Sequence, residues 1–317
     1  MVKIAIAGGS GQVGREVIDA LVATKKHEIV ILSRNVKSAI GDNSSGITWR
    51  AVDYDNKNSL VEGLQGIHTV LSFIQLLADP QNTAQKNLID AAIAAGVKRF
   101  APSEWGSASA IDMPWWSGKD EIKEYLKKVN ENGKVLEYIL FQPGLFLEYL
   151  AAPYKTAKHL EPLGTMIDFQ NRRAIVVEGH DAIMTYTTVK DVATIVARAV
   201  DLDVEWPVAG GISGNRVPIS ELLKIGEKVR GQAFTVEKVK LEDLEKGVLT
   251  ASWTLAASHP SVAQDQIEKM MKVVLIGTLL SSAKGAWDVS DAFNQIVPDF
   301  KFTQIENFLA EVWEGKP

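Results

Sequence analysis

Three glycines near the amino terminus have the spacing of a loop that holds a phosphate group. Gly8, Gly11 and Gly14 recur at three-residue intervals directly after a short apolar run at residues 3–7. A chain that turns sharply from a strand into a helix needs glycine here, because its N–H groups must approach a pyrophosphate at the positive end of the helix dipole. We therefore predict a dinucleotide-binding loop formed by Gly8, Ser10, Gly11, Gln12, Val13 and Gly14.

The residues after the second apolar run predict which dinucleotide binds. An NAD site usually carries Asp or Glu there for the ribose 2′-hydroxyl, whereas this chain reads Ser33-Arg34-Asn35. The planar guanidinium of Arg34 suits a ribose 2′-phosphate, and Lys37 could add a second cation. We expect NADPH rather than NADH. The alternative is that both cationic side chains are solvated loop residues.

Asp53 follows the third predicted strand, where its carboxylate could accept a hydrogen bond from the adenine amino group. An Asp in a turn also commonly bonds the backbone two residues ahead, which makes an Asx turn. Both interpretations of Asp53 stay open.

Lys119 is the residue whose position suggests proton transfer. Short-chain dehydrogenases place a Tyr-x-x-x-Lys pair on the helix before the sixth strand, and here that helix carries Lys119 with Trp115 at the tyrosine position. Ser117 and Asp120 have the spacing of a helix-capping signature. This spacing predicts that Lys119 lies in the first turn, where the helix dipole disfavours a cation.

The apolar stripe of the same helix suggests that Lys119 faces inward. Lys119 lies close to the stripe formed by Ile122, Tyr125, Leu126 and Val129. A buried lysine beside a nicotinamide should have a lowered pKa and could donate or accept a proton. The alternative is a lysine that extends from the rim of the helix into solvent.

The glycine loop and Lys119 require a sheet that holds them at one edge. Residues 1–150 alternate short β-branched runs with amphipathic helical patterns. Strands separated by helices give βαβ units and a parallel sheet covered on both faces. We expect an α/β fold with a doubly wound parallel sheet of the Rossmann type, its strands at residues 3–7, 28–32, 48–52, 69–73, 99–102 and 136–141.

The alternation weakens after Gly144, which indicates a second domain of mixed α/β character. Residues 171–173 predict a hairpin turn, and Thr188 with Asp191 fits a capping box that opens a further helix. We expect an NADP-binding domain and a smaller substrate-binding lid domain. Their predicted ranges are 1–152 with 185–205 and 153–184 with 206–317.

Composition excludes several classes of function. The chain has 317 residues, with 34 Lys+Arg against 39 Asp+Glu, so its formal charge is 34 − 39 = −5. It has no cysteine for a thiol nucleophile or an iron–sulfur cluster, and its mild negative charge argues against nucleic-acid binding. The longest apolar stretch is shorter than the ~20 residues of a membrane span, and the five histidines show no metal-ligand spacing. We expect a cytoplasmic monomer or homodimer without a metal, membrane or nucleic-acid partner.

Taken together, these motifs resemble those of the NmrA-like atypical short-chain dehydrogenases. Within them the chain is most similar to the isoflavone reductase and phenylcoumaran benzylic ether reductase group, with fungal members nearest in pattern. The most specific segment, Pro102-Ser-Glu-Trp-Gly106, resembles the Pro-Ser-Glu-Phe-Gly of that group. The resemblance also rests on residues 8–14, Arg34, residues 96–101, 119–123 and 187–191.

The resemblance implies an NADPH-dependent reductase in which one lysine, Lys119 here, acts as general acid or base beside the nicotinamide. It also implies that Phe73, Gln75, Ser103, Gln142, Pro143 and Phe146 line the cofactor. At residues 141–144, Phe-Gln-Pro-Gly, the chain departs from the plant enzymes, which usually carry an Asn-centred turn there. This departure concerns the substrate class more than the cofactor.

Aromatic side chains near these loops suggest a flat, conjugated substrate. Trp105, Trp115, Phe146 and Tyr149 could stack on such a molecule over the nicotinamide. These rings could equally pack the seam between the domains, and for Trp116 we favour that interpretation.

Two functions from different classes follow. The first is a reductase that transfers hydride from NADPH to an aromatic or enone-like secondary metabolite, with Lys119 delivering or relaying the proton. The second is a regulatory protein that senses NADP(H) and binds a protein partner without turnover, and it needs no ionisable group at position 119. A sugar-nucleotide epimerase shares the architecture but requires the tyrosine that Trp115 replaces, and it ranks last.

Overall fold

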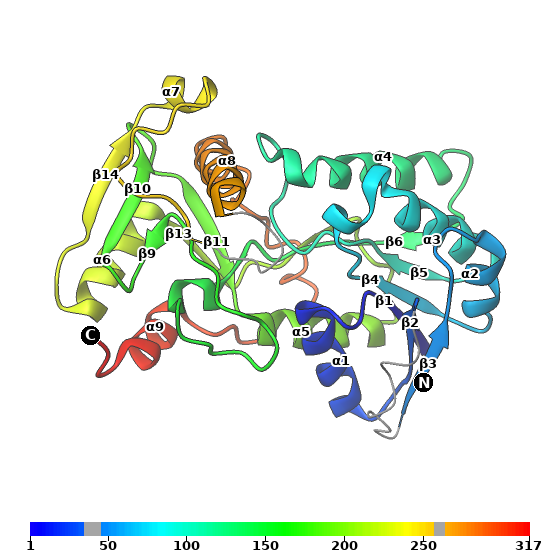
Figure 1. Cartoon of the computed structure of the whole chain (residues 1–317). Coiled ribbons are helices and arrows are strands. Elements are labelled where there is room, and N and C mark those ends of the chain that lie inside the picture. The colour runs from blue at the N-terminus through cyan, green and yellow to red at the C-terminus, as the bar shows by residue number, and fades with distance from the viewer. Residues whose placement is uncertain (35–45, 257–263) are drawn as a thin grey trace.

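The main sheet carries the candidate site at one edge. The computed structural model describes residues 1–34, 46–256 and 264–317. Among these residues, six parallel strands follow the order β3-β2-β1-β4-β5-β6 (Figure 1). They are β1 (Lys3–Ala7), β2 (Glu28–Ser33), β3 (Ile47–Ala51), β4 (Thr69–Ser72), β5 (Arg99–Ala101) and β6 (Glu137–Tyr138). The doubly wound sheet is confirmed, and β1 to β5 match their predicted ranges to within one residue.

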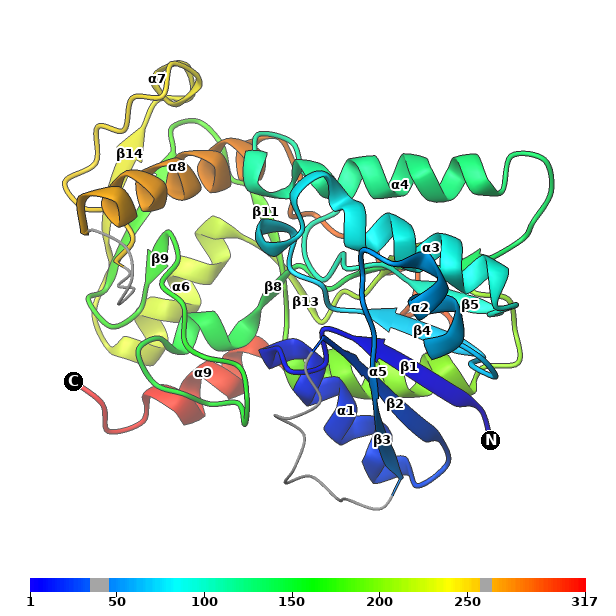
Figure 2. The ribbon, with the colours of Figure 1, turned by 45° about the vertical axis from the view of Figure 1, so that its right-hand side comes forward.

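Helices cover both faces of this sheet, as its apolar strands require. The helices are α1 (Gln12–Thr24), α2 (Lys57–Gly63), α3 (Thr83–Ala94), α4 (Ser117–Val129) and α5 (Val189–Asp201). Helices α1 and α5 pack side by side on one face, and α2, α3 and α4 cover the other (Figures 1 and 2). The strand order reverses between β1 and β4, and at such a point the carboxyl ends of the strands open a crevice for a ligand.

The sixth predicted strand, residues 136–141, forms two strands rather than one. β6 completes the main sheet beside β5, whereas β7 (Leu140–Gln142) pairs with β12 (Ala209–Gly211). The Leu140 N–H donates to the backbone oxygen of Val208, 2.9 Å away. The sequence could not predict this division, because the apolar run has no turn residue at this point. The division depends on β12, a partner strand that is distant in sequence.

The chain after β7 builds smaller sheets and the helices that close the molecule. Its further elements are β8 (Leu145–Phe146), β9 (Ile167–Asp168), β10 (Arg173–Val177), β11 (Ile183–Thr187), β13 (Asn215–Pro218), β14 (Thr235–Val239), α6 (Ile219–Arg230), α7 (Leu241–Glu245), α8 (Gln264–Ala283) and α9 (Ile305–Trp313). The predicted hairpin is confirmed, because β9 and β10 are antiparallel with Asp168 opposite Arg173. None of the helices in the described part of the chain is both long and apolar enough to cross a membrane.

The two predicted helix caps differ in outcome. Thr188 caps α5 as predicted, since its hydroxyl accepts the N–H of Asp191 at 3.1 Å. The predicted cap at Ser117 is wrong: the N-cap of α4 is Trp116, and the Ser117 hydroxyl donates to the backbone oxygen of Pro114 at 3.0 Å. A 3₁₀ turn over residues 114–116 runs directly into α4, so Ser117 already has helical dihedral angles.

Candidate active site

The glycine loop joins β1 to α1 at the carboxyl edge of the main sheet. Gly8 has a φ of +72°, and a Cβ at this position would lie 2.6 Å from the backbone oxygen of Phe73, directly after β4. Gly11 is the N-cap of α1, and within the described chain no side chain caps this helix. Of the other predicted loop residues, Ser10 and Gln12 are exposed, Val13 is half-buried and Gly14 is buried. The N–H groups of the first turn are therefore available to an anion.

Helix α1 also holds a segment from the middle of the chain. The side-chain oxygen of Gln12 accepts the N–H of Glu161 at 3.0 Å, and Glu16 accepts the N–H of His159 at 2.6 Å. Asp19 contacts the His159 ring at 2.9 Å. These contacts connect the glycine loop to the segment that continues to residues 163–166.

The predicted ribose and adenine residues lie beyond β2 and β3. Arg34 is exposed directly after β2. Burial raises the pKa of Tyr54, the neighbour of Asp53, and the charge of Arg34 opposes that rise. Lys37 lies outside the described residues. Asp53 is exposed, and one of its carboxylate oxygens accepts the N–H of Asp55 at 3.0 Å, which is the contact of an Asx turn. A hydrogen bond from the adenine amino group to the Asp53 carboxylate stays a prediction.

Three aromatic rings stack beside the glycine loop. Trp105 lies between Phe73, at 4.4 Å between ring centroids, and Phe141, at 5.5 Å. Its indole N–H donates to the backbone oxygen of Ser72 at 2.7 Å. Trp105 is therefore held against the ends of β4 and β7 rather than turned freely toward solvent.

The ends of β4 and β5 are tied together by one amide. The side-chain oxygen of Gln85 accepts the Ser72 hydroxyl at 2.7 Å and the N–H of Ser103 at 3.0 Å. The predicted cofactor residue Gln75 is exposed in the loop after β4, and Pro143 is buried after β7. These contacts place Ser103 at the same sheet edge as the glycine loop.

Lys119 lies in the first turn of α4 and is only 4% exposed, so its predicted burial is confirmed. Its amine donates to the backbone oxygen of Glu104 and lies 3.5 Å from the centre of the Trp116 ring. A Cβ at position 106 would lie 3.1 Å from this amine, so a glycine there leaves it room. Burial lowers the pKa of Lys119 from its usual value of 10.5 to about 7, against the opposing charge of Glu104.

Glu104 is a buried acid that the sequence analysis did not single out as a site residue. Its side chain is 1% exposed, and its carboxylate lies 3.4 Å from the Lys123 amine. The Gln142 amide donates to the same carboxylate at 3.3 Å. Burial raises the pKa of Glu104, while the charges of Lys119 and Lys123 lower it. The sequence could have pointed to Glu104, because this residue belongs to the Pro-Ser-Glu-Trp-Gly segment, the most specific part of the family resemblance.

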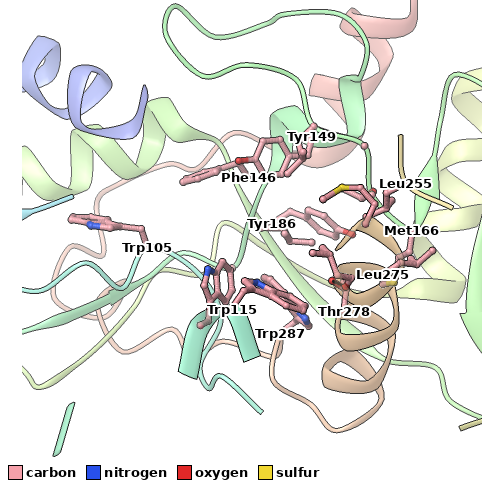
Figure 3. Close-up of a pocket in the computed structure, with 18 residues that line it drawn as sticks. Trp105, Trp115, Phe146, Tyr149, Met166, Tyr186, Leu255, Leu275, Thr278 and Trp287 are labelled. Atoms are coloured by element: carbon pink, nitrogen blue, oxygen red, sulfur yellow. Dashed lines mark hydrogen bonds between the residues drawn. The ribbon is translucent and has the colours of Figure 1, made fainter. Parts of the chain in front are cut away.

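A largely apolar cavity of about 240 Å³ adjoins this cluster. All four predicted substrate residues, Trp105, Trp115, Phe146 and Tyr149, line it (Figure 3). Trp116 lines the cavity too, although the sequence favoured a packing role for this ring. Because Trp116 also contacts the amine of Lys119, one indole joins the cavity to the buried lysine.

The far wall of the cavity comes from residues that the sequence analysis missed. They are Leu163, Gly164, Thr165, Met166, Tyr186, Leu255, Met271, Val274, Leu275, Thr278 and Trp287. Figure 3 shows Tyr186 on β11 between the ring pair of Phe146 and Tyr149 and the pair of Trp115 and Trp287. No local pattern could identify this wall, because its residues come from separate segments that meet only in the folded chain.

The described residues at this sheet edge and around the cavity form no metal centre. Within the described residues, no group of three or more His, Asp or Glu side chains could hold a metal ion. The chemistry available at this edge is therefore that of a lysine, a buried carboxylate and an open helix N-terminus beside aromatic walls.

Comparison with known proteins agrees with this architecture. The profile of the NmrA-like family matches residues 2–309. "Oxidoreductase swnN" of Metarhizium robertsii is 26% identical over 344 residues, which cover 100% of this chain and 98% of the relative. "Oxidoreductase BOA1" of Botryotinia fuckeliana is 30% identical over 241 residues, which cover 74% of this chain and 78% of the relative.

A solved structure has the same fold as this chain. The NADPH complex of the NADPH-dependent quinone oxidoreductase QOR2 from Escherichia coli matches with a TM-score of 0.70 and 21% sequence identity. The match covers 98% of this chain and 99% of that chain. This structure shows the shared fold, and the match of the family profile confirms the family resemblance inferred from the motifs.

Proposed function

This chain belongs to the NmrA-like family, and from that premise we propose that it is an NADPH-dependent reductase of aromatic or conjugated small molecules. The observation that carries the proposal is the position of Lys119. Its amine is buried at the sheet edge that bears the glycine loop, and the Trp116 ring that covers it also lines an aromatic cavity. An ionisable amine in such a place is typical of a group that transfers protons.

The residues at the sheet edge fit NADPH. The uncapped first turn of α1 offers N–H groups to the pyrophosphate, and the exposed Arg34 offers a guanidinium to the ribose 2′-phosphate. Ser33 stands at the end of β2, where an NAD site has its acid. Phe73, Ser103 and Gln142 are the further residues that we propose to border the cofactor. When bound, NADPH would supply the hydride.

Lys119 would supply the proton that balances the hydride. As an electron-poor carbon of the substrate accepts the hydride, the displaced electron pair moves to a substrate heteroatom, and the Lys119 ammonium donates its proton there. A pKa of about 7 allows both forms of the amine at neutral pH, which suits a general acid that must be reloaded.

The cavity supports a flat, apolar substrate. Aromatic rings favour stacking with a conjugated molecule, and the relative named as a quinone oxidoreductase suggests quinones as probes. We propose that residues 153–184 with 206–317 act as the lid domain, which supplies the residues of the far wall other than Tyr186.

One observation favours a second candidate, an NADP(H)-sensing regulator without turnover. Lys119 is covered by Trp116 at 3.5 Å and is not among the residues that line the cavity. A reductase requires the indole to move aside, whereas a sensor does not.

The test is NADPH oxidation, followed at the nicotinamide absorbance, with a panel of quinones, aromatic enones and quinone methides. We expect turnover with at least one class, and a loss of about 10²- to 10⁴-fold in kcat for Lys119→Met. Lys127→Met is the matched control, because this side chain on the same helix is 63% exposed. Tight NADPH binding without turnover across the panel would favour the sensor, and a loss below tenfold would remove Lys119 from the proton step.

A further inference from the structure

Glu104 is a buried carboxylate whose charge acts on two lysines of α4, Lys119 and Lys123. It comes from the loop after β5, while Lys119 and Lys123 lie one helical turn apart on α4. Its side chain is 1% exposed, so its charge acts in a medium that screens poorly. The Gln142 amide and the Lys123 amine together hold the carboxylate in place.

The same residue holds Lys119 through its main chain. The Lys119 amine donates to the backbone oxygen of Glu104, so the acid and the anchor belong to one residue. A Cβ at position 106 would also press on this amine and on Trp116, which restricts the site further. Hence the loop 104–106 sets where the amine lies and which charge it faces.

The charged groups around Lys119 extend from the buried Glu104 to the exposed Asp120. The groups that act on it in the described residues are Glu104, Lys123 and Asp120. Lys123 contacts Glu104 at 3.4 Å and Asp120 at 3.2 Å, and the side chain of Asp120 is 56% exposed. Lys123 therefore links the buried carboxylate to solvent.

We propose that Glu104 is a positioning residue for Lys119, fixing the amine with its backbone oxygen and favouring the charged form of the amine with its buried carboxylate. This inference rests on the proposed function, since it assigns Glu104 a role through the proton donor. It also assigns opposite effects to two neighbours: the carboxylate of Glu104 stabilises the ammonium, whereas the ammonium of Lys123 opposes it.

The signs of these effects give the test. Glu104→Gln preserves the shape of the side chain and removes its charge, so the pKa of Lys119 should fall by about one to three units. Lys123→Gln removes a like charge, so the pKa of Lys119 should rise. Glu104→Asp keeps the charge and should leave the pKa of Lys119 near its starting value, even where packing is disturbed.

The measurement is NMR of the full chain with ¹³C-labelled lysine, in which the Lys119 signal is the one missing from Lys119→Arg. Lys127→Gln is the control, because this exposed lysine pairs with Glu124 at 2.6 Å, away from the cluster. In parallel, the apparent pKa in the pH dependence of kcat with a quinone should change in the same direction as the pKa of Lys119 in each variant. If Glu104 had a merely structural role, its loss would lower activity or stability, but Glu104→Gln and Lys123→Gln would not change the pKa of Lys119 in opposite directions.

The outcomes separate this inference from the proposed function. Opposite displacements in Glu104→Gln and Lys123→Gln support it, and displacements that are absent or equal in sign overturn it. If Glu104→Gln does not fold, as judged by circular dichroism and NADPH binding, an unchanged or lowered pKa of Lys119 in Lys123→Gln overturns it and a raised one supports it. The titration needs no turnover, so an inactive protein would refute the reductase proposal while the role of Glu104 is still decided.

Discussion

Replacing Lys119 by methionine should make the protein more stable at neutral pH while it lowers kcat by about 10²- to 10⁴-fold. The amine is buried, and moving its pKa from 10.5 to about 7 corresponds to about 5 kcal/mol of unfolding free energy, at about 1.4 kcal/mol for each pKa unit. Methionine has a similar length and carries no charge, so the variant avoids this cost.

Two lost contacts offset part of the gain. The interaction between the amine and the Trp116 ring contributes about 1 to 2 kcal/mol. The backbone oxygen of Glu104 loses its donor, which costs about 1 to 3 kcal/mol. The net effect at pH 7 is therefore a stabilisation of up to about 3 kcal/mol, or a rise in Tm of about 2 to 4 °C for each kcal/mol.

The pH dependence carries the sharper test. Between pH 7 and 10.5 the unfolded chain binds the Lys119 proton and the folded chain does not, so the wild-type stability gains free energy from this group as pH rises. The advantage of Lys119→Met should be largest at or below pH 7 and should be lost by about pH 10.5. Urea unfolding of both proteins at pH 7 and pH 10 measures the difference, with Lys127→Met as the exposed control. A difference that is the same at both pH values would refute the reasoning.

Three further predictions concern the cofactor, the rate and the fold. Arg34→Ala should weaken NADPH binding by about 10- to 100-fold, because the guanidinium pairs with the 2′-phosphate, and leave NADH binding nearly unchanged; equal effects on the two Kd values would count against an NADPH site. The kcat for reduction should decrease as pH rises through about 7, because the ammonium form of Lys119 is lost; a rate that increases over this range would contradict the role as acid. Thr188→Ala should lower the unfolding free energy by about 1 kcal/mol, because the N–H of Asp191 loses its acceptor at the start of α5; urea unfolding measures this, and an unchanged midpoint would show that solvent replaces the cap.

The sequence by itself determined the elements that depend on near neighbours. The strands β1 to β5 follow from short β-branched runs, and the glycine loop from the backbone freedom that a strand-to-helix turn requires. The inward position of Lys119 could be read from the apolar stripe of its own helix. The capping of α5 by Thr188 was equally local.

Only the tertiary structure decided what these elements face. The split of residues 136–141 depends on β12, and the wrong cap at Ser117 depends on the 3₁₀ turn before it. The far wall of the cavity joins Met166, Tyr186 and residues of α8, which are separated by long stretches of chain. The charge that faces Lys119 comes from Glu104 on another loop. The periodicity of a sequence shows which side of an element is apolar, but it does not show which other element packs against that side. Tertiary packing determines the partner, and here it places a carboxylate and an aromatic cavity around one lysine.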